Sequence, residues 1–448
     1  MTSSNFGKEL LKSVTKPPDT FTATVHKAGG TRANTASAVV LRLGRWCRWS
    51  ADHRHRTFAK AATFVVATTL AAGCDGSPRA AESPATARYV AVIDRLVSDK
   101  VAPASDVVEV WVCDVPAATT DARYGDLALR RVLAPATVTA QIGDRVAGYF
   151  ATISHNRYVP SFVAGATVAM GADDTAEMCV DQALDRSSPA ATTVFAIATA
   201  EHAEGSPGGW GRPGSWHRCA GECPARTTRR AAYVGASDFS PDWGPVPLLD
   251  LIEHELGHTL GLPHSGVAVG AEPGVYQSGL DVMSDSASAR EVTGTPTRLD
   301  SSDTIGINRL DLGWMTVDDV VSIAAASPIG SPIAVRLNPS AGSSGTRLVV
   351  IELDTHRVLT VEFLTASGFD DHLGHGGVAV HLIDDTAGER EQRIQQPLGS
   401  APPHLDLMRA GEQFSAYGWT ITVTSVGSAT SAASRDDTTH VAIAPTER

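Results

Sequence analysis

The stretch HELGHTLGLPH, residues 254–264, carries three histidines, one glutamate and a glycine at fixed intervals. A random H-E-x-x-H occurs in roughly one chain in forty of this length, and the added glycine and third histidine reduce that to about one in ten thousand. The apolar spacing predicts that residues 246–262 form one helix. Positions i and i+4 lie about 40° apart on a helix, so His254 and His258 point the same way.

The rest of this motif supplies the parts of an open metal site. Gly261 can adopt the positive φ that ends a helix, and the chain then turns to bring His264 toward the other two imidazoles. Three neutral imidazoles suit Zn²⁺ and leave a fourth position for water, whose pKa bound zinc lowers to about 7. Glu255 can reach that water. We therefore expect one catalytic zinc on His254, His258 and His264, with Glu255 as the general base.

The pattern HExxHxxGxxH resembles that of the metzincin zinc metalloproteases. The resemblance implies a methionine turn, and SGLDVMSD supplies Met283, nineteen residues after His264, as an apolar floor and not a ligand. INRLDLGWM, residues 307–315, is similar to the segment that follows this turn in gametolysin-like and immune-inhibitor-A-like peptidases. VAGYFATISHNRYVPSFVAG, DHLGHGGVAVHLID and LMRAGEQFSAYGWTITVTS are also similar to parts of those proteins. The likeness touches most of residues 105–448 and implies a protein or peptide substrate.

One position departs from some metzincins, which carry a tyrosine two residues after the methionine. Asp285 occupies that place here. Transition-state stabilisation would then fall mainly to the zinc. Three other side chains are alternative donors: His217, Tyr233 and Tyr276.

A second metal, Ca²⁺, is a further expectation because secreted relatives often carry one. Asp300 and Asp303 in LDSSDTIG are the candidate ligands. Helix capping is the competing interpretation of both residues.

Composition and charge exclude some classes of protein. The 448 residues are 43% apolar and 19% charged, a globular composition long enough for two or three domains. Residues 1–73 hold 11 Lys/Arg and 3 Asp/Glu, a net of +8, so the remainder carries −20 within a total of −12. An acidic body argues against nucleic acid as a partner. No apolar run reaches about 18 residues, which argues against a membrane-spanning helix.

Residues 61–74, AATFVVATTLAAGC, follow three basic residues and have the layout of a secretory signal. LAAGC resembles a bacterial lipoprotein signal, in which Cys74 would be lipidated; a buried helix or an ordinary signal is the alternative. We expect a leader over residues 1–73, a flexible tether over 74–104 and a true start downstream of Met1. The expected location is extracellular or on the cell surface, with the membrane contacted only through the lipid anchor.

Four cysteines follow the leader: Cys113, Cys179, Cys219 and Cys223. An even number in an exported chain suggests two disulfides, for which three connectivities exist. The close spacing in CAGEC favours Cys219–Cys223, which leaves Cys113–Cys179. A zinc knuckle is disfavoured because there is no second close pair.

Alternating strand and helix patterns predict an α/β (α+β), metzincin-like catalytic domain over residues 105–320, with a mixed sheet and an active-site helix. The expected strands are residues 105–113, 161–170, 192–200 and 231–236, the expected earlier helix is residues 143–158, and residues 201–230 are expected to be loop. Short alternating runs in residues 328–448 predict a β-sandwich-like domain, for which we favour a packing role.

The sequence favours a secreted or surface-anchored zinc endopeptidase over two alternatives. One is a surface-binding lipoprotein whose zinc site is vestigial, which is disfavoured because the three histidines and Glu255 are all intact. The other is a zinc amidase that acts on cell-wall peptides. The long flanking domain and the expected methionine turn favour a protein substrate.

Overall fold

The computed structural model describes residues 104–116, 133–200, 202, 208–214, 229–236, 249–269, 272–294, 299–325, 331–384, 386, 393–396, 399–427 and 438–446. All of them belong to the unit Ser77–Arg448. The expected leader, Cys74, almost all of the tether, Cys219, Cys223 and His217 lie outside the described residues. No helix in the described part of the chain has the length and apolar character needed to cross a membrane.

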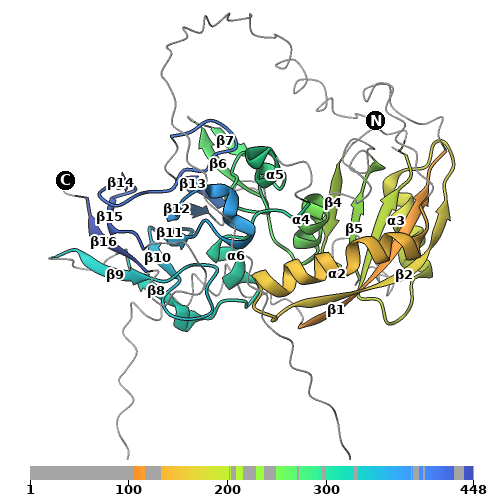
Figure 1. Ribbon diagram of the computed structural model, residues 1–448, viewed down its shortest axis with the longest axis horizontal. Coiled ribbons are helices and arrows are strands. Elements are labelled where there is room, and N and C mark those ends of the chain that lie inside the picture. Colours follow the sequence, from red (N-terminus) through yellow and green to blue (C-terminus); the bar gives the residue numbers. More distant parts are fainter. Residues whose placement is uncertain are drawn as a thin grey trace, which may run out of the picture. The chain divides into compact units, whose positions relative to one another are not determined.

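The first sheet has five strands in the order β2-β1-β3-β5-β4 (Figure 1). The bounds are β1 Ser105–Asp114, β2 Val159–Ala169, β3 Thr193–Ala198, β4 Gly209–Arg212 and β5 Arg230–Val234. The first three strands and β5 run parallel, whereas β4 runs antiparallel to β5. β1 and β3 are almost entirely buried, which explains their continuous apolar runs. The expected mixed α/β architecture is confirmed.

Helices cover both faces of this sheet. Their bounds are α2 Pro135–Ile153, α3 Ala176–Arg186 and α4 Leu249–Thr259. α2 and α4 share one core with Val108, Val110 and Ile197 of the sheet. The opposite face, with Trp111, Cys113 and Tyr233, packs on α3. The sheet therefore separates α4 and its histidines from α3.

The structure corrects three local expectations. The helix expected at residues 143–158 spans Pro135–Ile153, because Pro135 starts it and His155 and Asn156 adopt positive φ values of 53° and 59° just after its end. The expected loop at residues 201–230 contains strand β4. Helix α3 was not expected from its apolar spacing; the side chain of Thr175 caps it by accepting a hydrogen bond from the Met178 amide.

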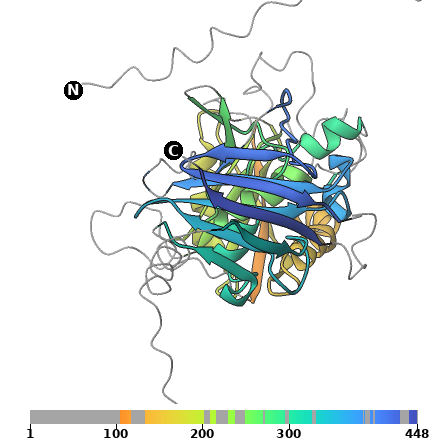
Figure 2. The ribbon, with the colours of Figure 1, turned by 90° about the vertical axis from the view of Figure 1, so that its left-hand side faces the viewer.

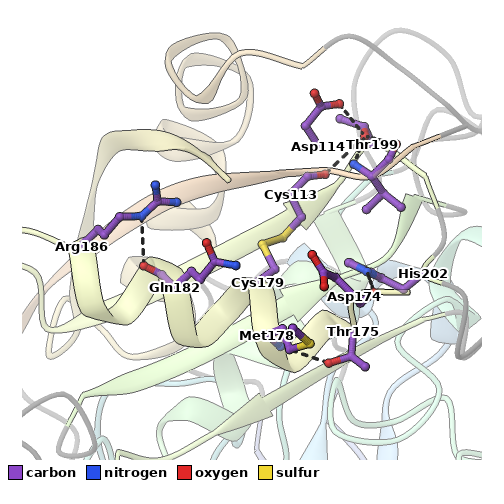
Figure 3. The surroundings of a disulfide bond; sticks show 11 residues. Cys113, Asp114, Asp174, Thr175, Met178, Cys179, Gln182, Arg186, Thr199 and His202 are labelled. Atoms are coloured by element: carbon purple, nitrogen blue, oxygen red, sulfur yellow. Dashed lines mark hydrogen bonds between the residues drawn. A yellow bond between two sulfur atoms is a disulfide. The ribbon is translucent and has the colours of Figure 1, made fainter. Parts of the chain in front are cut away.

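A disulfide joins β1 to α3 (Figure 3). The Cys113 and Cys179 sulfurs are bonded at 2.00 Å, and both side chains are buried. The expected pairing of these two cysteines is confirmed. The Cys219–Cys223 pairing lies outside the described residues and stays a prediction.

The C-terminal part is β-rich, and two of its sheets share one hydrophobic core (Figure 2). One sheet has the order β7-β6-β13-β12-β11-β10-β8 and the other β14-β15-β16-β9. The bounds are β6 Ser265–Val269, β7 Glu272–Val275, β8 Val320–Ile323, β9 Ile333–Leu337, β10 Leu348–Glu352, β11 Arg357–Leu364, β12 Gly377–Asp384, β13 Arg393–Gln396, β14 Gln413–Ala416, β15 Trp419–Ser425 and β16 Thr439–Pro445.

Strands β6 and β7 follow the zinc motif but belong to the larger C-terminal sheet. β6 pairs with β13 in parallel, with Ser265 opposite Arg393. The division into residues 105–320 and 328–448 stays a prediction, and these hydrogen bonds run across it.

Four short helices complete the described fold, three of them between β7 and β8 and one between β11 and β12. Their bounds are α5 Ser288–Thr293, α6 Gly306–Asp311, η6 Val317–Asp319 and η7 Gly368–Leu373. Just after α6, Trp314 stacks on Tyr158 with 6.1 Å between ring centroids and lies edge-on to Phe150 at 6.4 Å. The LGW segment thus anchors the end of α6 to the core under α2.

Candidate metal centre

The three histidines of the motif converge on one point. Helix α4 buries Leu249, Ile252 and Leu256 in the core, so its His254 and His258 project from another side, one turn apart. The Nε2 atom of His258 lies 3.1 Å from that of His254 and 2.8 Å from that of His264. The ligand atoms of all three lie within 4.8 Å of one another.

The chain that follows α4 turns as the sequence predicts. Gly261 has φ +91°, and the Leu262 amide donates to the Gly257 carbonyl at 3.2 Å. Only a residue without Cβ adopts such a backbone at no steric cost. This sharp turn returns His264 to the two histidines of α4.

Backbone carbonyls orient two of the imidazoles. His254 Nδ1 lies 2.6 Å from the Val282 carbonyl oxygen, and His258 Nδ1 lies 2.7 Å from that of Leu262. A carbonyl oxygen only accepts hydrogen bonds, so each Nδ1 carries the proton and donates it. Each Nε2 lone pair is therefore directed at the common point, as metal ligation requires.

Burial also favours the neutral imidazoles that bind metals. Burial, and then the neighbouring His258 and His264, hold the pKa of His254 well below its usual range. Burial lowers the pKa of His258 to about 4. Both rings are uncharged near neutral pH, so no proton has to be displaced when an ion binds. One buried and two half-buried imidazoles thus form a donor set that fits one ion of the Zn²⁺ type.

Glu255 is buried beside the cluster, where α4 lies against strand β4. A Cβ added to Gly209 would lie 2.7 Å from Glu255 Oε1, and one added to Gly211 would lie 2.0 Å from the Glu255 carbonyl oxygen. Only glycine permits so close an approach of strand and helix. Gly209 and Gly211 were missed in the sequence, although alternate glycines in GWGR share one face of a strand.

Met283 lies under the helix that carries the ligands. Its side chain is completely buried. Gly257 lies between the two histidines in the sequence of α4, and a Cβ added to it would be 2.5 Å from the Met283 sulfur. The Met283 carbonyl accepts a hydrogen bond from the Ser265 amide at 2.9 Å. An apolar floor below the cluster is the geometry that the methionine-turn expectation needs.

Of the alternative donors, the structure brings Tyr276 to the cluster. Its hydroxyl oxygen lies 3.0 Å from His264 Nε2, with 4.6 Å between the ring centroids. Its φ of +60° is uncommon for a bulky residue. Tyr233 instead stacks on Trp210 in the core under α3, on the other face of the sheet.

Asp285 does not replace the missing tyrosine. Its Oδ1 accepts a hydrogen bond from the Ala287 amide at 3.2 Å. Burial, and then Glu291, raise the pKa of Asp285 to about 6. The side chain therefore shapes the turn before α5.

The two expected calcium candidates face arginines. Asp300 pairs with Arg145 at 3.0 Å and Asp303 with Arg309 at 2.5 Å. A calcium site is unsupported. The capping interpretation is wrong for helix α6, whose N-cap residue is Ile305 with no side-chain cap.

A buried polar network next to the cluster was also missed in the sequence. Asp281, two residues before Met283, accepts a hydrogen bond from the Ser265 hydroxyl at 2.6 Å. Ser265 directly follows the third histidine. A lone aspartate in a polar turn reads as exposed, and only the tertiary structure buries it.

Comparisons with known proteins give little. No family model matches the chain, and no curated protein matches it. A chain from a structure of a chaperone–substrate complex is similar over 47% of this chain and 34% of that one, at 13% identity and a TM-score of 0.25. Metalloproteinase-II from Bacteroides fragilis is similar over 50% of this chain and 59% of that one, at 12% identity and a TM-score of 0.26. The matches thus span less than two thirds of either protein, and at these TM-scores neither carries an argument.

Proposed function

We propose that this chain is a zinc-dependent endopeptidase of the metzincin type. The observation that carries the proposal is the convergence of the His254, His258 and His264 Nε2 atoms beside Glu255. Three imidazoles, with a carboxylate adjacent to the first of them that is not itself a ligand, form the arrangement of a catalytic rather than a structural zinc site. Bound there, zinc would polarise a carbonyl and make a water molecule acidic.

Glu255 moves the proton in this proposal. It accepts a proton from the attacking water and delivers it to the leaving amine. Its burial against β4 keeps bulk water away from the carboxylate and fixes its position. The two carbonyl-oriented histidines hold their rings still while the proton moves.

Strand β4 would bind the substrate. Within the described residues, β4 pairs with β5 alone, so its other edge can accept an extended peptide as an additional strand. Gly209 and Gly211 bring one face of β4 close to Glu255, so a peptide paired on the free edge would lie beside that carboxylate. Main-chain pairing of this kind suits a peptide-bond substrate without demanding one side-chain sequence.

Tyr276 would stabilise the oxyanion. Its hydroxyl group lies 3.0 Å from the Nε2 atom of His264. Tyr276 is 45% exposed, so its side chain can reach a bound substrate. A phenol donates one hydrogen bond to charge that develops on the carbonyl oxygen.

The proposed location is extracellular or at the cell surface, with Cys74 as the lipid anchor. The Cys113–Cys179 disulfide supports export, because such bonds persist in oxidising compartments. The acidic body and the peptide-binding edge support a protein partner rather than nucleic acid.

The test is digestion of casein or gelatin by the full-length chain, with zinc content measured after dialysis. Glu255→Gln should retain zinc and lose about 10²- to 10⁴-fold in turnover. Glu177→Gln is the matched control. It makes the same chemical change at an exposed position of α3, on the face of the sheet opposite α4. An inactive parent that holds zinc would support the surface-binding alternative, and cleavage of cell-wall peptides alone would support the amidase. No zinc in the folded parent would overturn the proposal.

A further inference from the structure

His264, the third ligand, directly precedes strand β6, which pairs with a strand of the C-terminal region. β6 begins at Ser265, immediately after His264, and lies between β7 and β13. Its partner β13 comes about 130 residues later in the chain, with Arg393 opposite Ser265. The backbone direction at His264 therefore depends on a strand of the C-terminal sheet.

Asp281 connects this strand to the turn under the metal centre. Its Oδ2 accepts from the Ser265 hydroxyl at 2.6 Å, and its Oδ1 accepts from the Thr304 hydroxyl at 3.0 Å. The Asn308 amide nitrogen lies 3.3 and 3.1 Å from the two oxygens. The next residue is Val282, whose carbonyl orients His254. Asp281 thus contacts the surroundings of two ligands at once.

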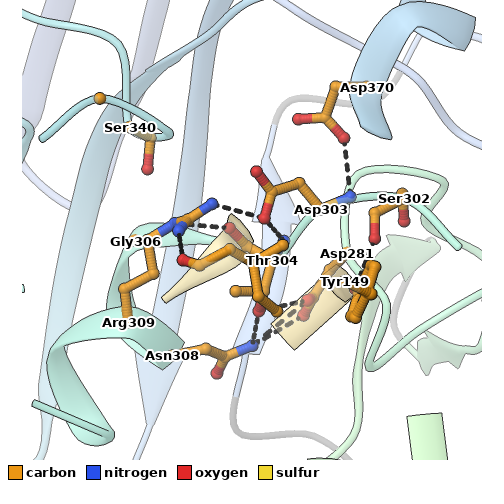
Figure 4. Close-up of polar contacts among 12 residues, drawn as sticks. Tyr149, Asp281, Ser302, Asp303, Thr304, Gly306, Asn308, Arg309, Ser340 and Asp370 are labelled. Carbon is orange, nitrogen blue, oxygen red and sulfur yellow. Dashed lines mark hydrogen bonds and ion pairs between the residues drawn. The ribbon is translucent and has the colours of Figure 1, made fainter. Parts of the chain in front are cut away.

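Two carboxylates of the C-terminal region hold the segment that contacts Asp281. The Asp303 amide donates to Asp370 Oδ1 at 2.9 Å (Figure 4). The Gly306 amide donates to Glu362 Oε2 at 2.7 Å. Asp370 belongs to η7 and Glu362 to β11, and both are buried.

Further C-terminal groups hold residues 277–279, which lead into the methionine turn. The His404 amide donates to the Gln277 carbonyl at 2.8 Å, and the Ser278 hydroxyl donates to Gln395 Oε1 at 2.9 Å. His372 Nε2 lies 2.9 Å from the Gly279 carbonyl oxygen. Residues 277–279 are thus hydrogen-bonded to His372, Gln395 and His404, which all belong to the C-terminal region.

We propose that the C-terminal β region positions the metal ligands, with Asp281 as the positioning residue through which its contacts reach His264 and His254. This inference rests on the proposed zinc site. It gives the region a task beyond packing: it sets the separation between the third ligand and the two on α4. Metal ligation tolerates errors of only about 0.5 Å, so ligand supports change metal affinity without contacting the metal.

A carboxylate suits this position because it only accepts hydrogen bonds. Ser265, Thr304 and Asn308 all present donors to Asp281. Asparagine has nearly the same shape, but either orientation of its amide sets an NH₂ group against one of these donors. Asp281→Asn therefore disturbs the hydrogen bonds and leaves the side-chain volume unchanged.

The test measures zinc affinity of the full-length chain by competition with a chelator, and its melting temperature with and without zinc. Asp281→Asn and Asp370→Asn should weaken zinc binding by about 10- to 100-fold. The increase in melting temperature on adding zinc should shrink, because that increase reflects affinity for the folded state. Asp371→Asn, an exposed neighbour of Asp370, is the matched control and should behave as the parent does.

Ser265→Ala keeps the test decisive if Asp281→Asn does not fold, since it removes one hydroxyl and should weaken zinc binding in the same direction. Parent-like zinc affinity in the folded variants would overturn the inference and leave the proposed function intact. So would an equal fall of the melting temperature with and without zinc, which indicates a structural role alone. A parent that binds no zinc would instead overturn the proposed function, and this inference with it.

Discussion

The α/β part, from β1 to α4, and the C-terminal β region, from β8 to β16, serve the same site in different ways. The first provides two histidines and Glu255 from a single helix of eleven residues. The second provides strand pairing and buried acceptors such as Glu362 and Asp370, which lie far along the chain from the groups they hold. Chemistry that a local motif encodes is visible in the sequence, whereas the support of that chemistry is visible only in the fold.

Breaking the Asp311–Arg393 ion pair should have the largest effect. Asp311 ends α6, Arg393 starts β13, and both side chains are almost completely buried. Asp311→Asn removes the carboxylate that Arg393 contacts, and breaking a buried ion pair of this kind costs about 3–5 kcal/mol. Zinc retention should fall too, because Arg393 stands opposite Ser265. Urea unfolding with and without chelator measures both.

The control for this variant is Asp354→Asn. Asp354 pairs with Arg357 at 2.6 Å, but the two side chains are 39% and 43% exposed. An exposed pair contributes at most about 1 kcal/mol. Equal losses for the two variants would show that the junction of α6 and β13 is no more important than the surface.

Removing the Cys113–Cys179 disulfide should separate stability from metal binding. The bond closes a loop with a sequence separation of 66, and in the chain-entropy model its loss costs about 4 kcal/mol. It lies in the core under α3, whereas α4 packs in the core on the other face of the sheet. Cys113→Ala with Cys179→Ala should therefore lower the urea midpoint and leave zinc affinity unchanged. A loss of zinc would mean that the first sheet also positions the ligands.

The same contrast decides what the sequence could predict. Helix α4, strands β1, β2, β3 and β5 and the alternating C-terminal strands follow from local spacing, and the structure has a helix or a strand at each place. Helix α4 ends at Thr259 and not at the expected residue 262. Strand β4 was hidden because Gly209 and Gly211 look like loop residues until a helix lies against them. The role of Asp281 was hidden because its donors lie 16 to 27 residues away. Contacts between residues so far apart in the sequence do not produce a periodic pattern of apolar and polar residues.

Filling the contact between β4 and α4 should reduce activity more than stability. Gly211→Ala places a Cβ 2.0 Å from the Glu255 carbonyl oxygen, so the strand must move away from the helix. Overpacking of this kind costs about 1–3 kcal/mol, and the proposed peptide edge moves with the strand. Gly148→Ala is the matched control, because no atom lies within 4 Å of its added Cβ on α2. Full proteolytic activity in Gly211→Ala would contradict a substrate role for β4.

Removing the Tyr276 hydroxyl should have a smaller effect, confined to catalysis. We expect Tyr276→Phe to lower kcat/KM about tenfold, or about 1.4 kcal/mol, with zinc content unchanged. Tyr417→Phe is a close control: Tyr417 is 44% exposed with φ +54°, against 45% and +60° for Tyr276. Equal activity in both variants would leave transition-state stabilisation to the zinc alone.

The last effect concerns the pH dependence of stability and lies within the C-terminal region, where two opposing shifts leave almost no net change in the parent. Glu362 Oε1 and His381 Nδ1 are 3.6 Å apart on β11 and β12. Burial raises the pKa of Glu362 to about 7 and lowers the pKa of His381 to about 4. Their usual values are about 4.3 and 6.5. Glu362 thus binds more protons in the folded state, and His381 binds more in the unfolded state.

These two shifts oppose each other. The contribution of Glu362 to stability is present at low pH and is lost as the pH rises through about 7, whereas that of His381 increases as the pH rises to about 6.5. Each slope is at most about 1.4 kcal/mol per pH unit, so in the parent they nearly cancel between about pH 5 and 6.5. Glu362→Gln copies the protonated carboxyl and should leave only the rising slope. Urea midpoints across this range test it, and parallel profiles for parent and variant would show that the burial of Glu362 does not shift its titration.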